Sequence, residues 1–247
     1  VVMSKSKGNV VIQEDVAKKY GIDSARLFLM FVSSPDKDME WDDKGLESIN
    51  KFVNRFYNLS KKVRSIKTDA KILNKLHRTI KSVTEDITKF KYNNAIISLW
   101  SYVDYLNKFD KIPKIAYEDL LLLFNVFCPH LCEELWSKLG KGFISLQKWP
   151  KFDKTKIDEK IEQEEVLIEN VFKDVRAILD LIKIKTPKNV YLYVIPKEIN
   201  IFNKIIKDLE KEFRLKFNVY SVNDKNKYDP ENRSKKAKLG KPAIFIE

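Results

Sequence analysis

The sequence predicts a mostly α-helical protein: an antiparallel helix bundle, a loop-containing segment before it and a small α/β domain after it. Three observations predict this class. Apolar residues recur with helical spacing between residues 43 and 138, which indicates amphipathic helices. Gly140, Gly142 and Pro150 then interrupt the pattern, and the charged residues 151–160 indicate a linker. Beyond them, strand-like and helix-like runs alternate, as in an α/β domain.

The segment before the bundle begins with residues 1–12, which indicate a loop that contains glycine, followed by a short apolar run. We expect a helix over residues 13–20, because Gly21 suits the backbone conformation that often ends a helix. A second helix is expected over residues 25–32. It ends at residues 33–36, where a proline follows two serines.

The bundle itself is predicted as four long amphipathic helices, and the short connections between them favour an antiparallel arrangement. The apolar residues of each helix follow the i, i+3, i+4, i+7 spacing of one buried face. The first three faces consist of Leu46, Ile49, Phe52, Val53, Phe56 and Leu59, then Ile72, Leu76, Ile80, Val83, Ile87 and Phe90, then Ala95, Ile96, Leu99, Val103 and Leu106. The fourth helical segment is expected over residues 117–139, and Pro129 inside it can begin a helical segment or kink one.

The last part of the chain changes its period. After a helix over residues 162–183, we expect a strand, a helix, a strand and a final strand, over residues 190–195, 201–213, 217–222 and 243–246. This order is typical of a small α/β domain. The sequence therefore predicts three domains, over residues 1–42, 43–152 and 153–247.

Charge and composition restrict the class of function. The 247 residues contain 47 Lys and Arg against 35 Asp and Glu, a net charge of +12. This excess favours a polyanionic partner, either nucleic acid or an anionic membrane surface. No stretch reaches the ~18 apolar residues of a membrane span, and no signal peptide is visible. Cys128 and Cys132 do not form a disulfide framework, so we expect a cytoplasmic protein without a membrane partner.

The motif with the most specific chemistry lies at the start of the chain. The run Val2-Met3-Ser4-Lys5-Ser6 resembles the KMSKS signature of class I aminoacyl-tRNA synthetases. When ATP is attacked at its α-phosphate, negative charge moves onto the leaving pyrophosphate, and an ammonium group on a mobile loop can stabilise it. Small residues let the backbone approach the phosphates. The resemblance implies that Lys5 is catalytic and that Met3, Ser4, Lys5 and Ser6 bind ATP.

The residues after the motif decide between this interpretation and a generic flexible terminus rich in lysine and serine. Residues 8–11 and 16–26 resemble the sequence that follows the signature in the leucine, isoleucine, valine and methionine enzymes. Residues 35–41 resemble leucyl-tRNA synthetases in particular. Val2 stands where the signature has its first lysine, which is a departure from the family pattern. The resemblance implies ATP as a substrate, accompanied by Mg²⁺ that is bound through phosphate oxygens.

Three tracts of the bundle, residues 90–96, 127–136 and 148–150, resemble the anticodon-binding bundle of the same enzymes. The resemblance implies that the bundle contacts the body of the tRNA. Cys128, His130 and Cys132 suggest zinc, but tetrahedral zinc usually takes four ligands and only three candidates occur together. We therefore interpret the thiols as apolar core groups and the histidine as structural, and we expect no metal site.

Positive charge gathers between residues 225 and 241. The basic residues there are Lys225, Lys227, Arg233, Lys235, Lys236, Lys238 and Lys241, and Tyr228 lies among them. Such a loop can bind phosphates and stack on an unpaired base, although charged runs are often only solvated. Residues 228–230, 235–237 and 240–247 resemble the C-terminus of archaeal-type leucyl enzymes, in which this domain contacts the long variable arm of leucine tRNA. The candidates are Lys235, Lys236, Lys238 and Lys241 for phosphates and Tyr228 for stacking.

The resemblance implies the C-terminal portion of a leucyl-tRNA synthetase, part of an enzyme that uses ATP to attach leucine to its tRNA. The sequence contains no nucleotide-binding fold with a HIGH-type motif, no leucine-binding residues and no editing domain. We expect these in an N-terminal catalytic and editing portion, in the same chain or in another subunit, and we expect the isolated chain to be inactive. The alternative is a free-standing tRNA-binding module without catalytic activity.

Overall fold

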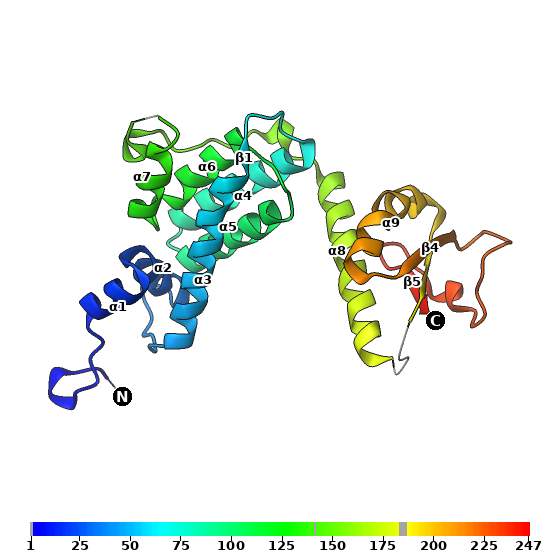
Figure 1. Cartoon of the computed structure of the whole chain (residues 1–247), viewed down its shortest axis with the longest axis horizontal. Helices are drawn as coiled ribbons and strands as arrows, with labels where there is room; N and C mark the ends of the chain where they lie inside the picture. Colours follow the sequence, from blue (N-terminus) through cyan, green and yellow to red (C-terminus); the bar gives the residue numbers. More distant parts are fainter. Residues whose placement is uncertain (1, 141, 183–186) are drawn as a thin grey trace. The chain divides into compact units, whose positions relative to one another are not determined.

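The computed structural model of the chain describes residues 2–140, 142–182 and 187–247, with the side chain of Lys5 outside the description. The chain forms two compact units, Val1–Ile157 and Asp158–Glu247, each with its own hydrophobic core (Figure 1). The boundary between the units, after residue 157, lies five residues beyond the one that the sequence predicts at residue 152. Among the described residues, no helix is long and apolar enough to cross a membrane.

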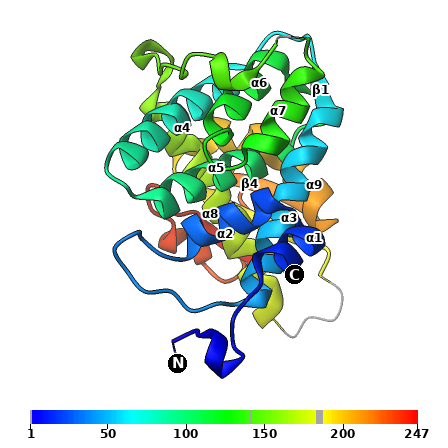
Figure 2. The ribbon, with the colours of Figure 1, turned by 90° about the vertical axis from the view of Figure 1, so that its left-hand side faces the viewer.

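The first unit begins with a 3-10 turn, η1 (Lys5–Lys7), and two helices, α1 (Gln13–Tyr20) and α2 (Ile22–Val32). The predicted bounds of α1 are confirmed. Gly21 separates the two helices with a φ of 83°, a conformation that residues with a side chain rarely adopt. Because the chain turns at this one residue, α2 starts at Ile22 rather than at residue 25. It packs against three helices of the bundle (Figure 2).

The bundle consists of α3 (Asp43–Leu59), α4 (Ala70–Thr88), α5 (Tyr92–Asn107), α6 (Lys114–Phe124) and α7 (Pro129–Ser137). The side chains of Asp42 and Asp69 accept hydrogen bonds from the first turns of α3 and α4, which caps both helices. A short parallel pair, β1 (Val63–Arg64) and β2 (Ile112–Pro113), joins two of the connections.

The expected fourth segment, over residues 117–139, is divided between two separate helices, α6 and α7. Pro129 has no N–H group and its ring excludes a preceding helical turn. The chain therefore leaves α6 at Phe124, whose carbonyl accepts hydrogen bonds from the N–H groups of Phe127 and Cys128. Pro129 then occupies the first position of α7, where a missing N–H group costs nothing.

The core of the first unit is aromatic and closely packed. Phe52 stacks on Trp100 with 4.2 Å between ring centroids, and Phe56 stacks on Phe124 at 4.3 Å. The predicted apolar faces are buried almost throughout, and Phe90 is the main exception because it is exposed at the end of α4. Phe90 has a positive φ of 56° and turns the chain into α5.

The end of the first unit corrects the predicted linker. Residues 151–157 lie along α4, because the N–H group of Asp153 donates to His77 Nδ1 at 3.2 Å. Upstream, Trp149 Nε1 donates to Thr84 Oγ1 at 2.8 Å. Two further 3-10 turns, η3 (Ile144–Leu146) and η4 (Lys154–Lys156), belong to this segment. A connection that is this well attached belongs to the bundle, so a linker over all of residues 151–160 was a wrong prediction.

The second unit is an α/β fold, as predicted. It contains α8 (Glu159–Leu181), β3 (Asn189–Val194), η5 (Pro196–Glu198), α9 (Ile199–Phe213), β4 (Lys216–Ser221), η6 (Arg233–Lys236) and β5 (Ala243–Ile246). The sheet order is β4-β3-β5, with β4 parallel and β5 antiparallel to β3. The strands follow the predicted ranges within one residue. Residue 183, the predicted end of the first helix, lies outside the described residues.

The two faces of this sheet differ in chemistry. Alternation along β3 directs Val190, Leu192 and Val194 toward a core that they share with α8 and α9. Tyr191 and Tyr193 belong to the opposite face, in a separate cluster of mainly aromatic residues. The segment between β4 and β5, residues 222–242, carries the basic run and is attached to this aromatic face through Tyr228.

Candidate nucleic-acid interface

The signature segment forms a small closed loop. Asn9 closes it, because its Oδ1 accepts a hydrogen bond from the N–H group of Ser4 at 2.8 Å and its Nδ2 donates to the Val2 carbonyl at 3.4 Å. Gly8 has a φ of 64°, which allows the turn. The sequence analysis did not single out Asn9, although an asparagine just after a glycine is a known turn signal.

The predicted ATP-binding residues are partly described. Met3 and Ser6 are exposed, and Ser4 is half-buried with its hydroxyl 3.2 Å from that of Ser6. The side chain of Lys5 lies outside the description. The described site residues of the loop are therefore accessible to a ligand, and two of them carry hydroxyl groups.

In the second unit, the aromatic face presents Tyr228. Its ring lies 4.9 Å from the ring of Tyr191, and 45% of the residue is exposed. Its hydroxyl donates to Glu247 Oε2 at 3.0 Å, while the hydroxyl of Tyr191 donates to Glu247 Oε1 at 2.7 Å. The hydroxyl of Tyr193 donates to the Tyr228 carbonyl. Tyr228 is thus fixed by its ring, its hydroxyl and its backbone.

The environment of these tyrosines keeps their hydroxyl groups protonated. Burial, aided by the hydrogen bond to Glu247, raises the pKa of Tyr191 to about 12. Burial also raises the pKa of Tyr193, and the hydrogen bond to Glu247 raises the pKa of Tyr228. The three phenols therefore carry no charge at neutral pH, and the charged group beside Tyr228 and Tyr191 is the carboxylate of Glu247.

Asp229 organises the basic loop. Its two oxygens accept hydrogen bonds from the N–H groups of Arg233 and Ser234, at 2.7 and 3.0 Å. Partial burial favours the protonated acid, but these bonds and the Ser234 hydroxyl outweigh it and lower the pKa of Asp229. The carboxylate is therefore occupied in shaping the turn into η6, which begins after Asn232 in the left-handed conformation.

A second turn carries the other predicted lysines. Lys238 and Lys241 exchange backbone hydrogen bonds of 2.9 and 3.0 Å across a tight turn. Gly240, with a φ of 75°, donates its N–H group to Glu198 Oε1 at 2.8 Å. Glu198 is buried, so this acceptor attaches the turn to the body of the unit. Sequence reasoning missed Glu198, because it lies far from the basic run in the chain.

The structure does not bring all four predicted phosphate lysines together, although each is exposed. Lys235 lines a cavity of about 440 Å³ with Lys225 and Lys227. Lys236 and Lys241 line another, of about 320 Å³. Lys238 lies among the lining residues of neither cavity. Three of the four predicted lysines therefore lie at two basic hollows rather than at one.

The two interpretations made for the bundle can also be compared with the structure. Cys128 and Cys132 are both buried free thiols, as predicted. Burial raises the pKa of each, which leaves them unreactive. His130 lies on the first turn of α7 and contacts the carboxylate of Asp23 on α2, so it joins two helices.

In this chain a signature loop, a helical bundle and a basic α/β unit follow one another. This order indicates the class of protein to which the chain belongs. The anticodon-binding domain family of tRNA ligases matches residues 69–228, and the class I tRNA synthetase family for isoleucine, leucine, methionine and valine matches residues 2–42. The chain belongs to the anticodon-binding domain family of tRNA ligases. The match extends past residue 157 and so includes much of the second unit.

The chain's relatives are leucine–tRNA ligases. It is 41% identical over 167 residues to that of Orientia tsutsugamushi (strain Boryong), covering 64% of this chain and 20% of the relative. It is 34% identical over 192 residues to that of Thermotoga maritima, covering 68% and 23%. The chain thus spans about a fifth of the length of these relatives.

A solved structure shares the fold. The crystal structure of the ternary complex of Agrobacterium radiobacter K84 agnB2 LeuRS-tRNA-LeuAMS matches with a TM-score of 0.56 and 23% identity. The match covers 63% of this chain and 23% of that one. At this identity the similarity supports the fold alone.

Proposed function

We propose that this chain is part of a leucine–tRNA ligase, which attaches leucine to its tRNA at the expense of ATP. The observation that carries the proposal is the order of the parts in one chain. A class I segment at residues 2–42 precedes the anticodon-binding domain match at residues 69–228, and sequence identity relates this chain to leucine enzymes. The catalytic and editing portion is the partner that the function requires, in the same chain or as a subunit.

In this proposal the signature loop acts on ATP. Lys5 stabilises the negative charge that develops on pyrophosphate as leucine attacks the α-phosphate. Met3, Ser4 and Ser6 border the nucleotide, and the hydrogen bonds of Asn9 support the loop. Mg²⁺ travels with ATP on the phosphate oxygens. Val2 stands where the signature has a lysine. The loop therefore has one cation fewer, and Lys5 supplies more of the positive charge that stabilises pyrophosphate.

The second unit, in this proposal, contacts leucine tRNA at its long variable arm. Lys235, Lys236, Lys238 and Lys241 bind phosphates, and Tyr228 stacks on an unpaired base. The exposure of these lysines and the fixed, half-exposed ring of Tyr228 support this assignment. The enzyme acts in the cytoplasm. The archaeal type that residues 240–247 suggest stays a prediction, because the relatives named above are bacterial.

The catalytic part is tested in the assembled enzyme. Leucine-dependent exchange of pyrophosphate into ATP should fall about a hundredfold in Lys5→Ala. Lys18→Ala is the matched control, since Lys18 is an exposed lysine on α1, and it should exchange at the rate of the unaltered enzyme. If the two variants exchange equally well, the catalytic assignment of Lys5 is wrong.

The departure at Val2 supports one alternative, a free-standing tRNA-binding module in which the loop is a vestige. The two candidates differ in one observable. A module binds leucine tRNA but leaves leucine activation unchanged whether or not the chain is present. A component of the ligase restores activation to the catalytic portion, and Lys5→Ala removes that restoration.

A further inference from the structure

The cavity of about 320 Å³ in the second unit, here called the second hollow, gathers positive charges that no ion pair compensates. Lys236 and Lys241 both line it, and neither forms an ion pair within the described part of the chain. Asp174 of α8 is the one carboxylate among its described lining residues, and Arg233, which also lines it, pairs with Glu231 instead. Ammonium groups at one cavity repel each other, so contacts elsewhere in the chain must keep them together.

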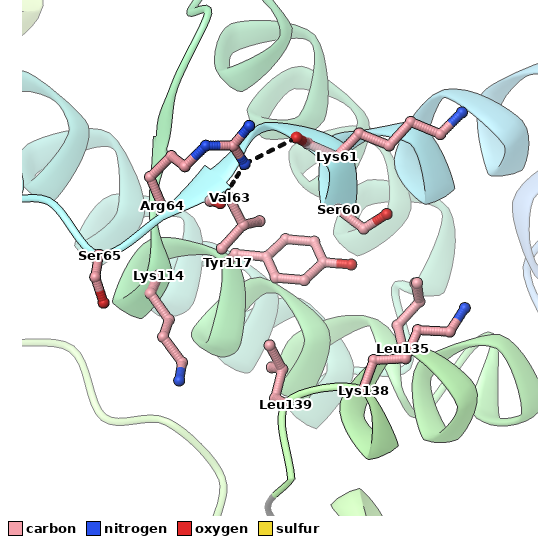
Figure 3. Close-up of a pocket in the computed structure, with 10 residues that line it drawn as sticks. All are labelled: Ser60, Lys61, Val63, Arg64, Ser65, Lys114, Tyr117, Leu135, Lys138 and Leu139. Atoms are coloured by element: carbon pink, nitrogen blue, oxygen red, sulfur yellow. Dashed lines mark hydrogen bonds between the residues drawn. The ribbon is translucent and has the colours of Figure 1, made fainter.

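A basic cavity of the first unit holds its cations differently (Figure 3). Around this cavity of about 480 Å³, Lys114 and Lys138 pair with glutamates one helical turn away, at 3.8 and 2.8 Å. Arg64 Nη1 donates to the carbonyls of Lys61 and Val63, at 3.0 and 2.7 Å. These side chains are held by acceptors that they contact directly. The lysines of the second hollow have no such ion pair in the described structure, so their backbone has to be held instead.

The turn of residues 238–241 is attached to the rest of the second unit through Glu198. Lys238 and Lys241 exchange two backbone hydrogen bonds across the turn. Gly240 has a φ of 75°, and its N–H group donates to Glu198 Oε1 at 2.8 Å. This hydrogen bond joins positions 42 residues apart in the chain. It therefore fixes the place from which the Lys241 side chain extends into the second hollow.

Glu198 itself has a fixed position. Only 6% of the residue is exposed, and it lies between η5 and the start of α9. A carboxylate at the N-terminal end of a helix interacts favourably with the helix dipole, which offsets part of the cost of its burial. Its second oxygen, Oε2, is buried and has no hydrogen-bond partner among the described residues. A carboxylate that is buried for one hydrogen bond adds little stability, which points to a role in positioning.

We propose that Glu198 is a positioning residue for tRNA binding: through Gly240 it holds the turn so that Lys241 lies beside Lys236 at the second hollow. A preformed pair of cations binds a phosphate more tightly, because the ligand does not have to order the pair first. Glu198 touches no RNA in this role and acts through the turn alone. The inference rests on the proposed function, since tRNA as the ligand is taken from there.

The direction of one effect tests this role. Glu198→Ala removes a negative charge, so electrostatics alone would leave the binding of tRNA unchanged or make it tighter. The proposal predicts the opposite, several-fold weaker binding of the whole chain to fluorescently labelled leucine tRNA. In a salt series, the slope of log K against log salt should also become smaller, by about 0.7–0.9 for each phosphate contact that is lost.

Two variants serve as controls for the charge and for the hydrogen bond. Asp208→Ala is matched in charge, because Asp208 is an exposed carboxylate on the same helix, α9, and it should not weaken binding. Glu198→Gln keeps an oxygen that can accept from the N–H group of Gly240, and it should bind like the unaltered chain. If Glu198→Ala binds as tightly as Asp208→Ala, the proposal is overturned.

Combined variants distinguish an effect on the turn from a general loss of fold. In a chain that already carries Lys238→Ala and Lys241→Ala, Glu198→Ala should cause no further loss of affinity. Lys235→Ala, at the other hollow, should weaken binding equally with and without Glu198→Ala. A further loss in the doubly substituted chain would show that Glu198 does not act through the turn. If Glu198→Ala fails to fold, Glu198→Asp takes its place, because the shorter side chain no longer reaches Gly240, and the same results are expected.

Hydrogen exchange without tRNA tests the structural step by itself. The amide of Gly240 should exchange slowly in the unaltered chain and in Glu198→Gln, and faster in Glu198→Ala. Equal exchange in all three chains would overturn the proposal. A chain that shows the expected exchange but binds no tRNA would contradict the proposed function and, with it, the role of Glu198 in binding, while its hold on the turn would stand.

Discussion

Glu247 Oε2 accepts a hydrogen bond of 3.0 Å from the hydroxyl of Tyr228. The other carboxylate oxygen accepts one of 2.7 Å from Tyr191. One carboxylate on the edge of the sheet therefore sets the position of the exposed aromatic ring in the basic segment. This arrangement explains how a tyrosine in a loop keeps one orientation without being buried, which lowers the entropy that a stacked base would otherwise have to overcome.

The first prediction concerns stacking on Tyr228. Tyr228→Ala should weaken binding to leucine tRNA roughly tenfold, because stacking requires the ring. Tyr228→Phe should bind nearly as well, since it keeps the ring and loses only the hydrogen bond to Glu247. Fluorescence anisotropy at constant salt measures both. Equal loss in the two variants would contradict the prediction that the ring alone is sufficient for stacking.

The second prediction concerns the carboxylate of Asp23. It contacts His130 Nδ1 at 3.0 Å and accepts from the N–H group of Leu131 at 2.7 Å, so it attaches α7 to α2. Asp23→Ala should lower the free energy of unfolding of the first unit by about 1–3 kcal/mol, because a buried donor loses its acceptor. Asp36→Ala, in an exposed turn, should have almost no effect.

Tryptophan fluorescence is the appropriate probe for that unfolding experiment. The four tryptophans of the sequence all lie before residue 158, so their emission during urea unfolding reports on the first unit alone. His130→Ala should cost less than Asp23→Ala, because the imidazole is 71% exposed and water can replace it. If His130→Ala lowered the free energy of unfolding more than Asp23→Ala, the contact of Asp23 with the histidine would matter more than its hydrogen bond to the backbone of α7.

The third prediction concerns the buried thiols. Because burial raises the pKa of Cys128 and of Cys132, neither should react with a thiol reagent at pH 8 while the chain is folded. Both should react after unfolding in urea. Ser48→Cys places a thiol on the exposed face of α3 and should react at once in the folded chain. Fast labelling of Cys128 or Cys132 in the folded state would contradict their burial.

The fourth prediction concerns alkaline pH and Tyr191. Its folded pKa is raised to about 12, whereas an unfolded tyrosine ionises near 10. Between these values the unfolded chain releases a proton that the folded chain keeps, so the free energy of unfolding falls as pH rises from about 10. Below pH 10 this contribution is fully present.

Circular dichroism of the sheet and helices against urea at several pH values measures this dependence. Tyr191→Phe, which has no proton to release, should show a shallower fall above pH 10 than the unaltered chain. An unchanged pH dependence would mean that Tyr191 ionises with an ordinary pKa and that its hydrogen bond to Glu247 contributes little.

The sequence predicted those elements whose signals are local. Gly21 ends α1 where expected, and the apolar run over residues 243–246 coincides with β5. The break between α6 and α7 was left open, because Pro129 can begin a helix or kink one, and Leu131 and Leu135 continue the helical period across it. The packing of residues 151–157 on α4 was missed for a related reason: it depends on a hydrogen bond to His77, far away in the chain.

The candidate site was predictable to a similar degree. A basic run with an aromatic residue identified Tyr228 and its lysines, because they are close in sequence. Glu247 and Glu198 could not be identified, since their roles arise only when the sheet places them beside the loop.

The measurement that tests the central claim most directly compares binding of the purified chain to leucine tRNA with and without its long variable arm, across a salt series. We predict clearly weaker binding and a smaller salt slope when the arm is removed, because the phosphate contacts of the second unit are lost. Equal affinity and equal slope for both tRNAs would contradict the assignment of the second unit to leucine tRNA and would leave only a nonspecific basic surface.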